Sequence, residues 1–120
     1  MAFKFENLLV WQSAVELSNS IDSLTKEFPT EEKYVLSSQI KRASDTISLN
    51  IAEGSTGQSN KEFGRFLGIA LRSAIEVVTC LHLGKGRGVI GEQDFKFHYK
   101  ELTEIIRMIQ GLRNSLANKQ

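Results

Sequence analysis

The chain is poor in residues that impose covalent or rigid local constraints, since it contains only 1 cysteine and 1 proline. Cys80 has no partner for an intramolecular disulfide, and the chain does not open with the charged, apolar and small-residue regions of a secretory signal. These two observations favour a reducing, cytoplasmic compartment. Charges interrupt every apolar segment before it reaches the roughly 20 residues that cross a bilayer, so no membrane partner is expected.

The chain also lacks a charge excess, because 15 Lys and Arg residues face 14 Asp and Glu residues and give a net charge of +1. Any surface for an anionic partner must therefore be a local patch of basic side chains. With 120 residues, 41% of them hydrophobic and 24% charged, the chain fits one folded domain over 1–120. Its length is enough to bury a core without a disulfide or a structural metal.

Apolar residues recur at steps of three and four along most of the chain, which indicates amphipathic helices. The pattern predicts four helices at about 8–28, 31–53, 60–83 and 92–117. Short connections between helices of similar length favour antiparallel neighbours. We therefore predict an all-α fold, an antiparallel up-down-up-down four-helix bundle. The predicted core consists of Trp11, Ala14, Leu17, Ile21, Leu24, Phe28, Leu36, Ile40, Ala43, Ile47, Ile51, Phe63, Phe66, Leu67, Ala70, Ala74, Val77, Leu81, Phe95, Tyr99, Leu102, Ile105, Ile106, Ile109, Leu112 and Leu116.

Polar and helix-breaking residues mark the expected ends of the first two helices. Asn7 is a candidate N-cap for the first helix, and Pro29 ends it. Thr30, followed by two glutamates, supplies a cap and first-turn carboxylates for the second helix. Gly54 is placed to stop the second helix in a left-handed conformation.

The third helix has the clearest boundaries. Ser59 and Glu62 have the spacing of a capping box, in which each side chain binds a free backbone N–H. Gly84, Gly86 and Gly88 are expected to end this helix. Their spacing matches neither the dinucleotide pattern nor the P-loop pattern, and a helix rather than a strand precedes them, so we interpret them as a flexible connection.

A second stripe runs along the third helix beside its core face. It consists of Gly64, Gly68, Leu71 and Ile75, and His82 continues it. Because glycine costs a helix about 1 kcal/mol relative to alanine, two glycines one turn apart suggest that another backbone comes close. A tight contact with a helix of the same chain and an interface between subunits explain the stripe equally well.

Basic residues form a stripe on the opposite face of the third helix. Its members are Lys61, Arg65 and Arg72, and Lys41, Arg42, Lys85 and Arg87 can extend it. Such a stripe is a candidate surface for the phosphates of RNA or DNA. A solvated helix face is the more common explanation, particularly because Arg72 can pair with Glu76 one turn away.

Catalytic and metal-binding patterns are missing from the sequence. His82 and His98 have no identifiable serine, cysteine or carboxylate partner, and the Glu-x-x-His spacing of metal-binding bundles does not occur. His98 falls near the core stripe of the fourth helix, where a partly buried histidine is common. We therefore expect no enzyme activity, no cofactor and no metal site.

Three segments have a distinctive sequence: FENLLVWQSAVEL at 5–17, FPTEEKYVLSSQIKRASDTISLNIAEG at 28–54 and KEFGRFLGIALRSAIEV at 61–77. They resemble a bacterial family of four-helix-bundle proteins encoded by intervening sequences within 23S ribosomal RNA genes. The resemblance covers almost the whole chain. Relatives commonly have a proline where this chain has Ser48, so the second helix is expected to be less kinked or straight.

The resemblance implies the same order of helices, no enzyme activity and a homo-oligomer, which in relatives is a pentameric barrel. A related accessory protein of diversity-generating retroelements uses a basic pentamer surface to engage reverse transcriptase and nucleic acid. Two hypotheses follow for this chain. It is either a self-associating bundle that binds RNA or DNA through Lys41, Arg42, Lys61, Arg65 and Arg72, or an oligomeric scaffold or accessory subunit that binds only protein.

Overall fold

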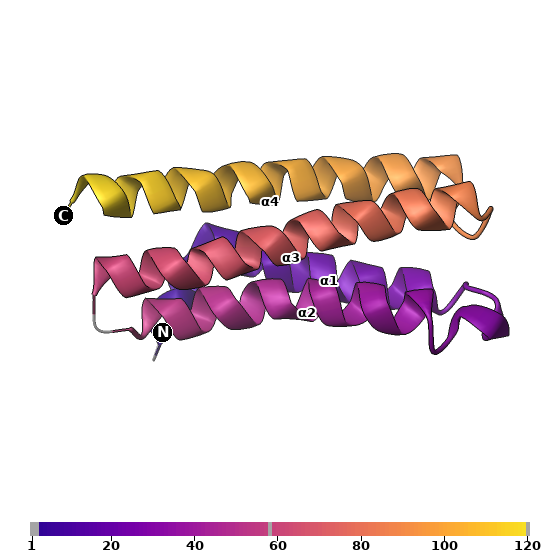
Figure 1. Cartoon of the computed structure of the whole chain (residues 1–120), viewed down its shortest axis with the longest axis horizontal. Coiled ribbons are helices and arrows are strands. Elements are labelled where there is room, and N and C mark those ends of the chain that lie inside the picture. The colour runs from indigo at the N-terminus through magenta and orange to yellow at the C-terminus, as the bar shows by residue number, and fades with distance from the viewer. Residues whose placement is uncertain (1–2, 58, 120) are drawn as a thin grey trace.

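The computed structural model describes residues 3–57 and 59–119, so the two ends of the predicted 1–120 domain lie outside the described residues. Over these residues the chain forms four long helices, which lie side by side along one axis (Figure 1). The helices are α1 (Leu9–Thr25), α2 (Leu36–Ser55), α3 (Asn60–Gly86) and α4 (Glu92–Asn118), with short 3-10 turns η1 (Lys4–Asn7) and η2 (Thr30–Glu32). The prediction of an all-α fold with four helices is confirmed.

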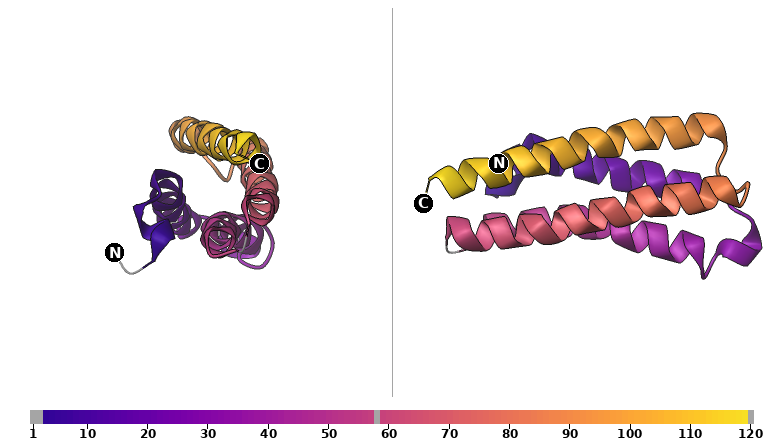
Figure 2. Two further views of the ribbon diagram at one scale, coloured as in Figure 1. Left: turned by 90° about the vertical axis from the view of Figure 1, so that its left-hand side faces the viewer. Right: turned by 45° about the horizontal axis from the view of Figure 1, so that its top comes forward.

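The helices follow one another around the bundle, each antiparallel to the one before it (Figure 1). The end-on view in Figure 2 shows α2 and α3 close together and α1 lying apart from α4 on the more open side. Contacts between residues are most extensive between α2 and α3 and least extensive between α1 and α4. The molecule measures 46 × 24 × 21 Å, as expected for helices of this length lying side by side with their axes aligned.

The core forms from the apolar stripes that the sequence predicts. Leu17, Ile47, Leu67 and Ile109, one from each helix, are fully buried. Five predicted members of the core differ: Tyr99 is exposed, and four others are only partly buried, namely Trp11, Phe66, Ile106 and Leu112. The core also includes residues that the prediction omitted, namely Val10, Cys80 and Ile90.

The predicted cap of α1 is wrong. Asn7 is the last residue of η1, and Leu8 occupies the N-cap position without a side-chain hydrogen bond. The turn before α1 is instead closed by Glu6, whose carboxylate accepts a hydrogen bond of 2.9 Å from the backbone N–H of Phe3. The periodicity of the sequence does not distinguish such a 3-10 turn from the first turn of the helix.

The predicted start of α2 is also wrong. Thr30 begins η2, and α2 begins only at Leu36, after Val35 adopts a non-helical conformation. Glu32 bridges the two segments because its carboxylate accepts a hydrogen bond of 3.3 Å from the N–H of Leu36. The residues after Pro29 thus form a separate turn that lies against the end of the bundle.

The prediction that Gly54 stops α2 in a left-handed conformation is wrong. α2 continues to Ser55, and Gly54 has no positive φ. A Cβ atom at Gly54 would lie 2.7 Å from Cβ of Phe66 and 2.9 Å from Cδ1 of Phe63. Glycine is therefore required here because α2 and α3 approach closely. The helix also runs without interruption through Ser48, as expected from the absence of proline.

Ser59 caps α3 as predicted, since its Oγ accepts a hydrogen bond of 3.1 Å from the N–H of Glu62. The other half of the predicted capping box, a bond from the Ser59 N–H to the Glu62 carboxylate, does not form between these two described residues. At the other end α3 runs to Gly86, three residues beyond the predicted end. Gly88 then has a φ of 72°, and the N–H groups of Gly88 and Val89 bind the carbonyls of Lys85 and Gly84 at 3.1 and 2.8 Å. This is a Schellman ending, for which only the last of the three glycines supplies the left-handed residue.

By length and composition alone, α3 meets the criterion for a helix that could cross a membrane, with a mean hydropathy of 1.6 over its most apolar window. This differs from the expectation that charges interrupt every apolar segment. A share of 39% of that window is buried inside the bundle, where α3 packs on α2 and α4. A core helix of a bundle passes the same test, so the finding is weak evidence for a membrane span.

Candidate functional site

The five basic residues proposed from the sequence are all exposed, but the structure places them in separate regions. Lys61 and Arg65 lie at the start of α3, and Lys41 and Arg42 lie on the outer face of α2. Arg72 belongs to the middle of α3 and lines neither of the two hollows described below. The five residues therefore do not form one continuous stripe.

The first region is a hollow between the start of α3 and the end of α4, which we call the α3–α4 hollow. It has a volume of about 560 Å³. Within the described part of the chain it is lined by Lys61, Arg65 and Arg113 together with a single carboxylate, that of Glu62. Arg113 lies far from the other two cations in the sequence and reaches them because α4 runs antiparallel to α3 (Figure 1). With three cations and one anion in the lining, this hollow has a concentrated positive charge. The net charge of the chain is only +1.

Two of these cations lie close to other residues of α3. A Cβ atom at Gly68 would lie 3.2 Å from Nη2 of Arg113, so the missing side chain of Gly68 makes room for the guanidinium group. The guanidinium carbon of Arg65 lies 4.6 Å from the centroid of the Phe66 ring, a cation–π contact. Both guanidinium groups thus lie beside the hollow, and neither the position next to Gly68 nor the Phe66 ring supplies a carboxylate to neutralise them.

The candidate interface residues lie on the same side of α3 as this hollow. Gly64 lines the hollow, and no atom of residues 3–57 or 59–119 beyond its own helix backbone and chain neighbours lies within 4 Å of the position where its Cβ would be. A close approach of another helix of this chain therefore does not explain Gly64, and at Gly68 the neighbour is a flexible side chain. Leu71 is partly buried against the core, whereas Ile75 keeps 52% of its surface exposed.

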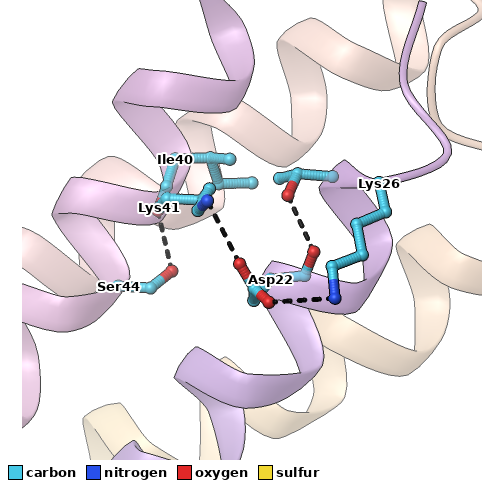
Figure 3. A network of polar contacts seen from close by, with 6 residues as sticks. Asp22, Lys26, Ile40, Lys41 and Ser44 are labelled. Carbon is cyan, nitrogen blue, oxygen red and sulfur yellow. Dashed lines mark hydrogen bonds and ion pairs between the residues drawn. The ribbon is translucent and has the colours of Figure 1, made fainter. Parts of the chain in front are cut away.

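The second region is a groove along the end of α1, the connection after it and the outer face of α2, which we call the α1–α2 groove. It encloses about 820 Å³, and Lys41 and Arg42 lie in it together with Lys26 and Lys33. Figure 3 shows Asp22 between Lys26 and Lys41, with N–O distances of 3.6 and 3.1 Å. The nearby Lys41 ammonium lowers the pKa of Asp22 below its ordinary value, so this carboxylate stays charged at neutral pH.

The basic residues near the end of α3 do not extend either region as free cations. Lys85 binds Glu92 at 2.8 Å and lowers the pKa of that carboxyl, and Arg87 binds Glu32 at 3.2 Å. The pairing expected between Arg72 and Glu76 is also not the contact that forms. The Glu76 carboxylate instead accepts a hydrogen bond of 3.3 Å from the Gln39 side chain.

His98 has a serine partner, contrary to the expectation from the sequence. Its Nε2 lies 2.8 Å from Oγ of Ser20, and its Nδ1 lies 2.7 Å from the carbonyl oxygen of Asp94. A serine next to an oriented histidine is a pattern found in nucleophilic catalysis. Here the imidazole is 4% exposed, and neither residue lines the α3–α4 hollow or the α1–α2 groove, so the contact joins two helices rather than facing either site.

Sequence reasoning missed Arg113, Lys26, Lys33 and the Ser20–His98 pair. The antiparallel order of the helices, which brings the end of α4 to the start of α3, was a signal that could have identified Arg113. The other residues meet across the α1–α2 and α1–α4 contacts, for which the spacing within one helix holds no information. Over the described residues, no group of three or more His, Cys, Asp or Glu side chains is arranged to hold a metal ion.

Comparisons with known proteins agree with the fold. No curated protein matches the chain. Among solved structures, a protein of unknown function from the S23 ribosomal protein family of Bacteroides thetaiotaomicron has 29% sequence identity and a TM-score of 0.83, over 88% of this chain and 96% of its own. The family model of the 23S rRNA-intervening sequence protein matches residues 6–111. The chain therefore belongs to the family of 23S rRNA-intervening sequence proteins.

Proposed function

We propose that the chain is a non-catalytic, self-associating, cytoplasmic bundle that binds the phosphate backbone of RNA or DNA through the basic side chains of α2 and α3, together with Arg113 of α4. One observation carries this proposal: Lys61 and Arg65 meet Arg113 around the α3–α4 hollow, and among the described residues that line it Glu62 has the only carboxylate. Clustered cations of this kind bind phosphates by displacing counterions, and they need no base-reading motif.

Self-association strengthens the proposal. A repeated subunit presents the same basic hollow several times, so that one nucleic acid can contact several copies at once. The partly exposed apolar side chains of Leu71 and Ile75 supply a surface for such an assembly, and the resemblance to relatives suggests a pentamer.

Fluorescence anisotropy with a labelled RNA hairpin and a labelled DNA duplex tests the proposal. We expect binding at about 50 mM salt that weakens steeply towards about 200 mM, because each contacted phosphate adds about one unit to the slope of log K against log salt. Replacing Lys61, Arg65 and Arg113 together by alanine removes the hollow's cations. This variant is expected to bind more weakly to both probes and to lower the slope by two to three units, at about one per cation.

The matched control removes three exposed cations of α4 outside the hollow, with Lys96, Lys100 and Arg107 replaced by alanine. It changes the net charge by the same amount and is expected to keep most of the salt slope. Equal losses in the two variants would show binding by net charge alone. If the wild-type protein binds neither probe at low salt, the proposal is wrong, and the alternative of a scaffold that contacts only protein takes its place.

A further inference from the structure

The α1–α2 groove has a different chemistry from the α3–α4 hollow. Four cations line it, Lys26, Lys33, Lys41 and Arg42, and Asp45 is the single carboxylate in the lining. The lining thus carries three more positive than negative charges. Its outer wall follows one face of α2 from Ser37 to Leu49, about 18 Å at 1.5 Å per residue, which is long enough for several nucleotides.

Two of these cations already have a partner, but the partner holds them weakly. Asp22 lies outside the lining and binds Lys26 and Lys41 through pairs whose side chains are all substantially exposed. Exposed ion pairs of this type contribute little, because water and salt screen them. A phosphate group entering the groove can therefore compete with Asp22 for both ammonium groups.

An exposed aromatic ring stands at the end of the groove where η2 meets α2. Tyr34 lines the groove and is 83% exposed, the largest fraction among the exposed large hydrophobic residues. Nζ of Lys33 lies 5.4 Å from the ring centroid, so a cation accompanies the ring. An aromatic ring next to a row of cations is the arrangement with which proteins stack unpaired bases while holding the backbone.

A serine hydroxyl adds a directional contact to the groove. Ser37 lines the groove, and its hydroxyl makes no hydrogen bond to another residue within 3–57 or 59–119. Its Oγ is not among the buried polar atoms without a partner, so the hydroxyl stays accessible from the groove. The groove thus offers a hydrogen-bond donor to a phosphate or base oxygen as well as positive charge.

We propose that the α1–α2 groove binds a single strand of nucleic acid, with an unpaired base stacked on Tyr34 and its phosphates on Lys33, Lys41 and Arg42. The occupant is a single strand because the bases of a duplex are already stacked on one another and cannot cover an aromatic side chain. Stacking and phosphate contacts use groups that RNA and DNA share, so strands of both kinds bind. This assignment rests on the proposed function, that the protein binds nucleic acid. It specifies an unpaired strand as the ligand, and it places that strand in the α1–α2 groove, which is separate from the α3–α4 hollow.

The test compares labelled single strands of about 12 nucleotides, oligo-U and oligo-dT, with a duplex DNA of equal length in anisotropy titrations at low salt. Tyr34→Ala is expected to weaken binding of both single strands about ten-fold and to leave duplex binding within about two-fold. Tyr34→Phe keeps the ring and is expected to bind like the wild type. Phe97→Ala removes an exposed aromatic ring of α4 outside the groove and is the matched control.

Each outcome separates this assignment from the broader proposal. If Tyr34→Ala binds single strands like the wild type, or loses single strands and duplex equally, the assignment of the groove is wrong. The Lys61, Arg65 and Arg113 variant still tests the broader proposal in that case, because it acts on the other hollow. A lower mass of Tyr34→Ala in solution would show that the ring joins subunits, which would also overturn the assignment.

Discussion

Ser20 on α1 and His98 on α4 are joined by a hydrogen bond of 2.8 Å. The carbonyl oxygen of Asp94 can only accept, so it fixes the hydrogen of the imidazole on Nδ1. In the neutral ring Nε2 is then the acceptor for the Ser20 hydroxyl. Among neighbouring helices, α1 and α4 have the fewest residues in contact. The Ser20–His98 bond therefore joins the two helices whose packing against each other is the least extensive.

Ser20→Ala is therefore expected to destabilise the protein by about 1–2 kcal/mol, since it leaves a buried ring nitrogen without a partner. Urea unfolding followed by circular dichroism measures the change. Ser23→Ala removes an exposed serine from the same helix and is the control, with an expected change within about 0.5 kcal/mol. Equal stability of the two variants would mean that the Ser20–His98 bond contributes nothing.

Two glycines inside helices are expected to respond to alanine in opposite ways. At Gly54 a Cβ atom would meet Phe66 and Phe63 at 2.7 and 2.9 Å, and we expect Gly54→Ala to cost about 1–3 kcal/mol through overpacking. At Gly111 nothing lies within 4 Å of a Cβ atom, so Gly111→Ala should stabilise α4 by about 0.5–1 kcal/mol. Thermal or urea unfolding measures both. A stabilising Gly54→Ala would contradict the close packing of α2 on α3.

Cys80 is expected to be unreactive in the folded protein. Burial raises the pKa of its thiol, with a further contribution from the Glu76 carboxylate, so little reactive thiolate forms at pH 8. Labelling by a disulfide reagent should be slow in buffer and fast in urea. The control is Ser115→Cys in a Cys80→Ala background, which places a thiol at an exposed position of α4. Similar labelling rates for the two thiols in buffer would contradict the buried position of Cys80.

The sequence predicts the fold well because burial repeats along each helix with the period of the helix itself. Leu17, Ile47 and Ile109 are identified in this way, and all three are fully buried. Caps are predicted less well, since they depend on single hydrogen bonds. Ser59 is correct, whereas Asn7 and Thr30 are replaced by 3-10 turns that use the same polar residues.

The candidate sites are predicted only in part, because they form between helices. The spacing within α3 places Lys61 near Arg65, but only the packing of α4 against α3 brings Arg113 to them. Tyr34 shows the same limit. It falls within the predicted second helix, but the structure places it in the turn between η2 and α2, before the break at Val35 that the periodic pattern does not contain.

The exposed side chain of Ile75 gives the sharpest test of self-association. Its burial in the single chain is incomplete, with 52% of its surface exposed on the same side of α3 as Gly64, Gly68 and Leu71. Ile75→Glu therefore leaves the core intact but places a charge on the proposed interface. We expect it to lower the mass measured by light scattering while the helix content stays unchanged, because a buried, unpaired carboxylate is costly.

Leu9→Glu is the matched control, since Leu9 is an exposed aliphatic residue at the start of α1, away from this side of α3. It introduces the same charge and is expected to keep the wild-type mass. Gly68→Leu is less suitable, because the new side chain would also displace Arg113 and alter the basic hollow. If Ile75→Glu keeps the wild-type mass, or if the wild-type protein is already a monomer, this side of α3 does not join subunits. Its exposed isoleucine then contacts only water or a different protein.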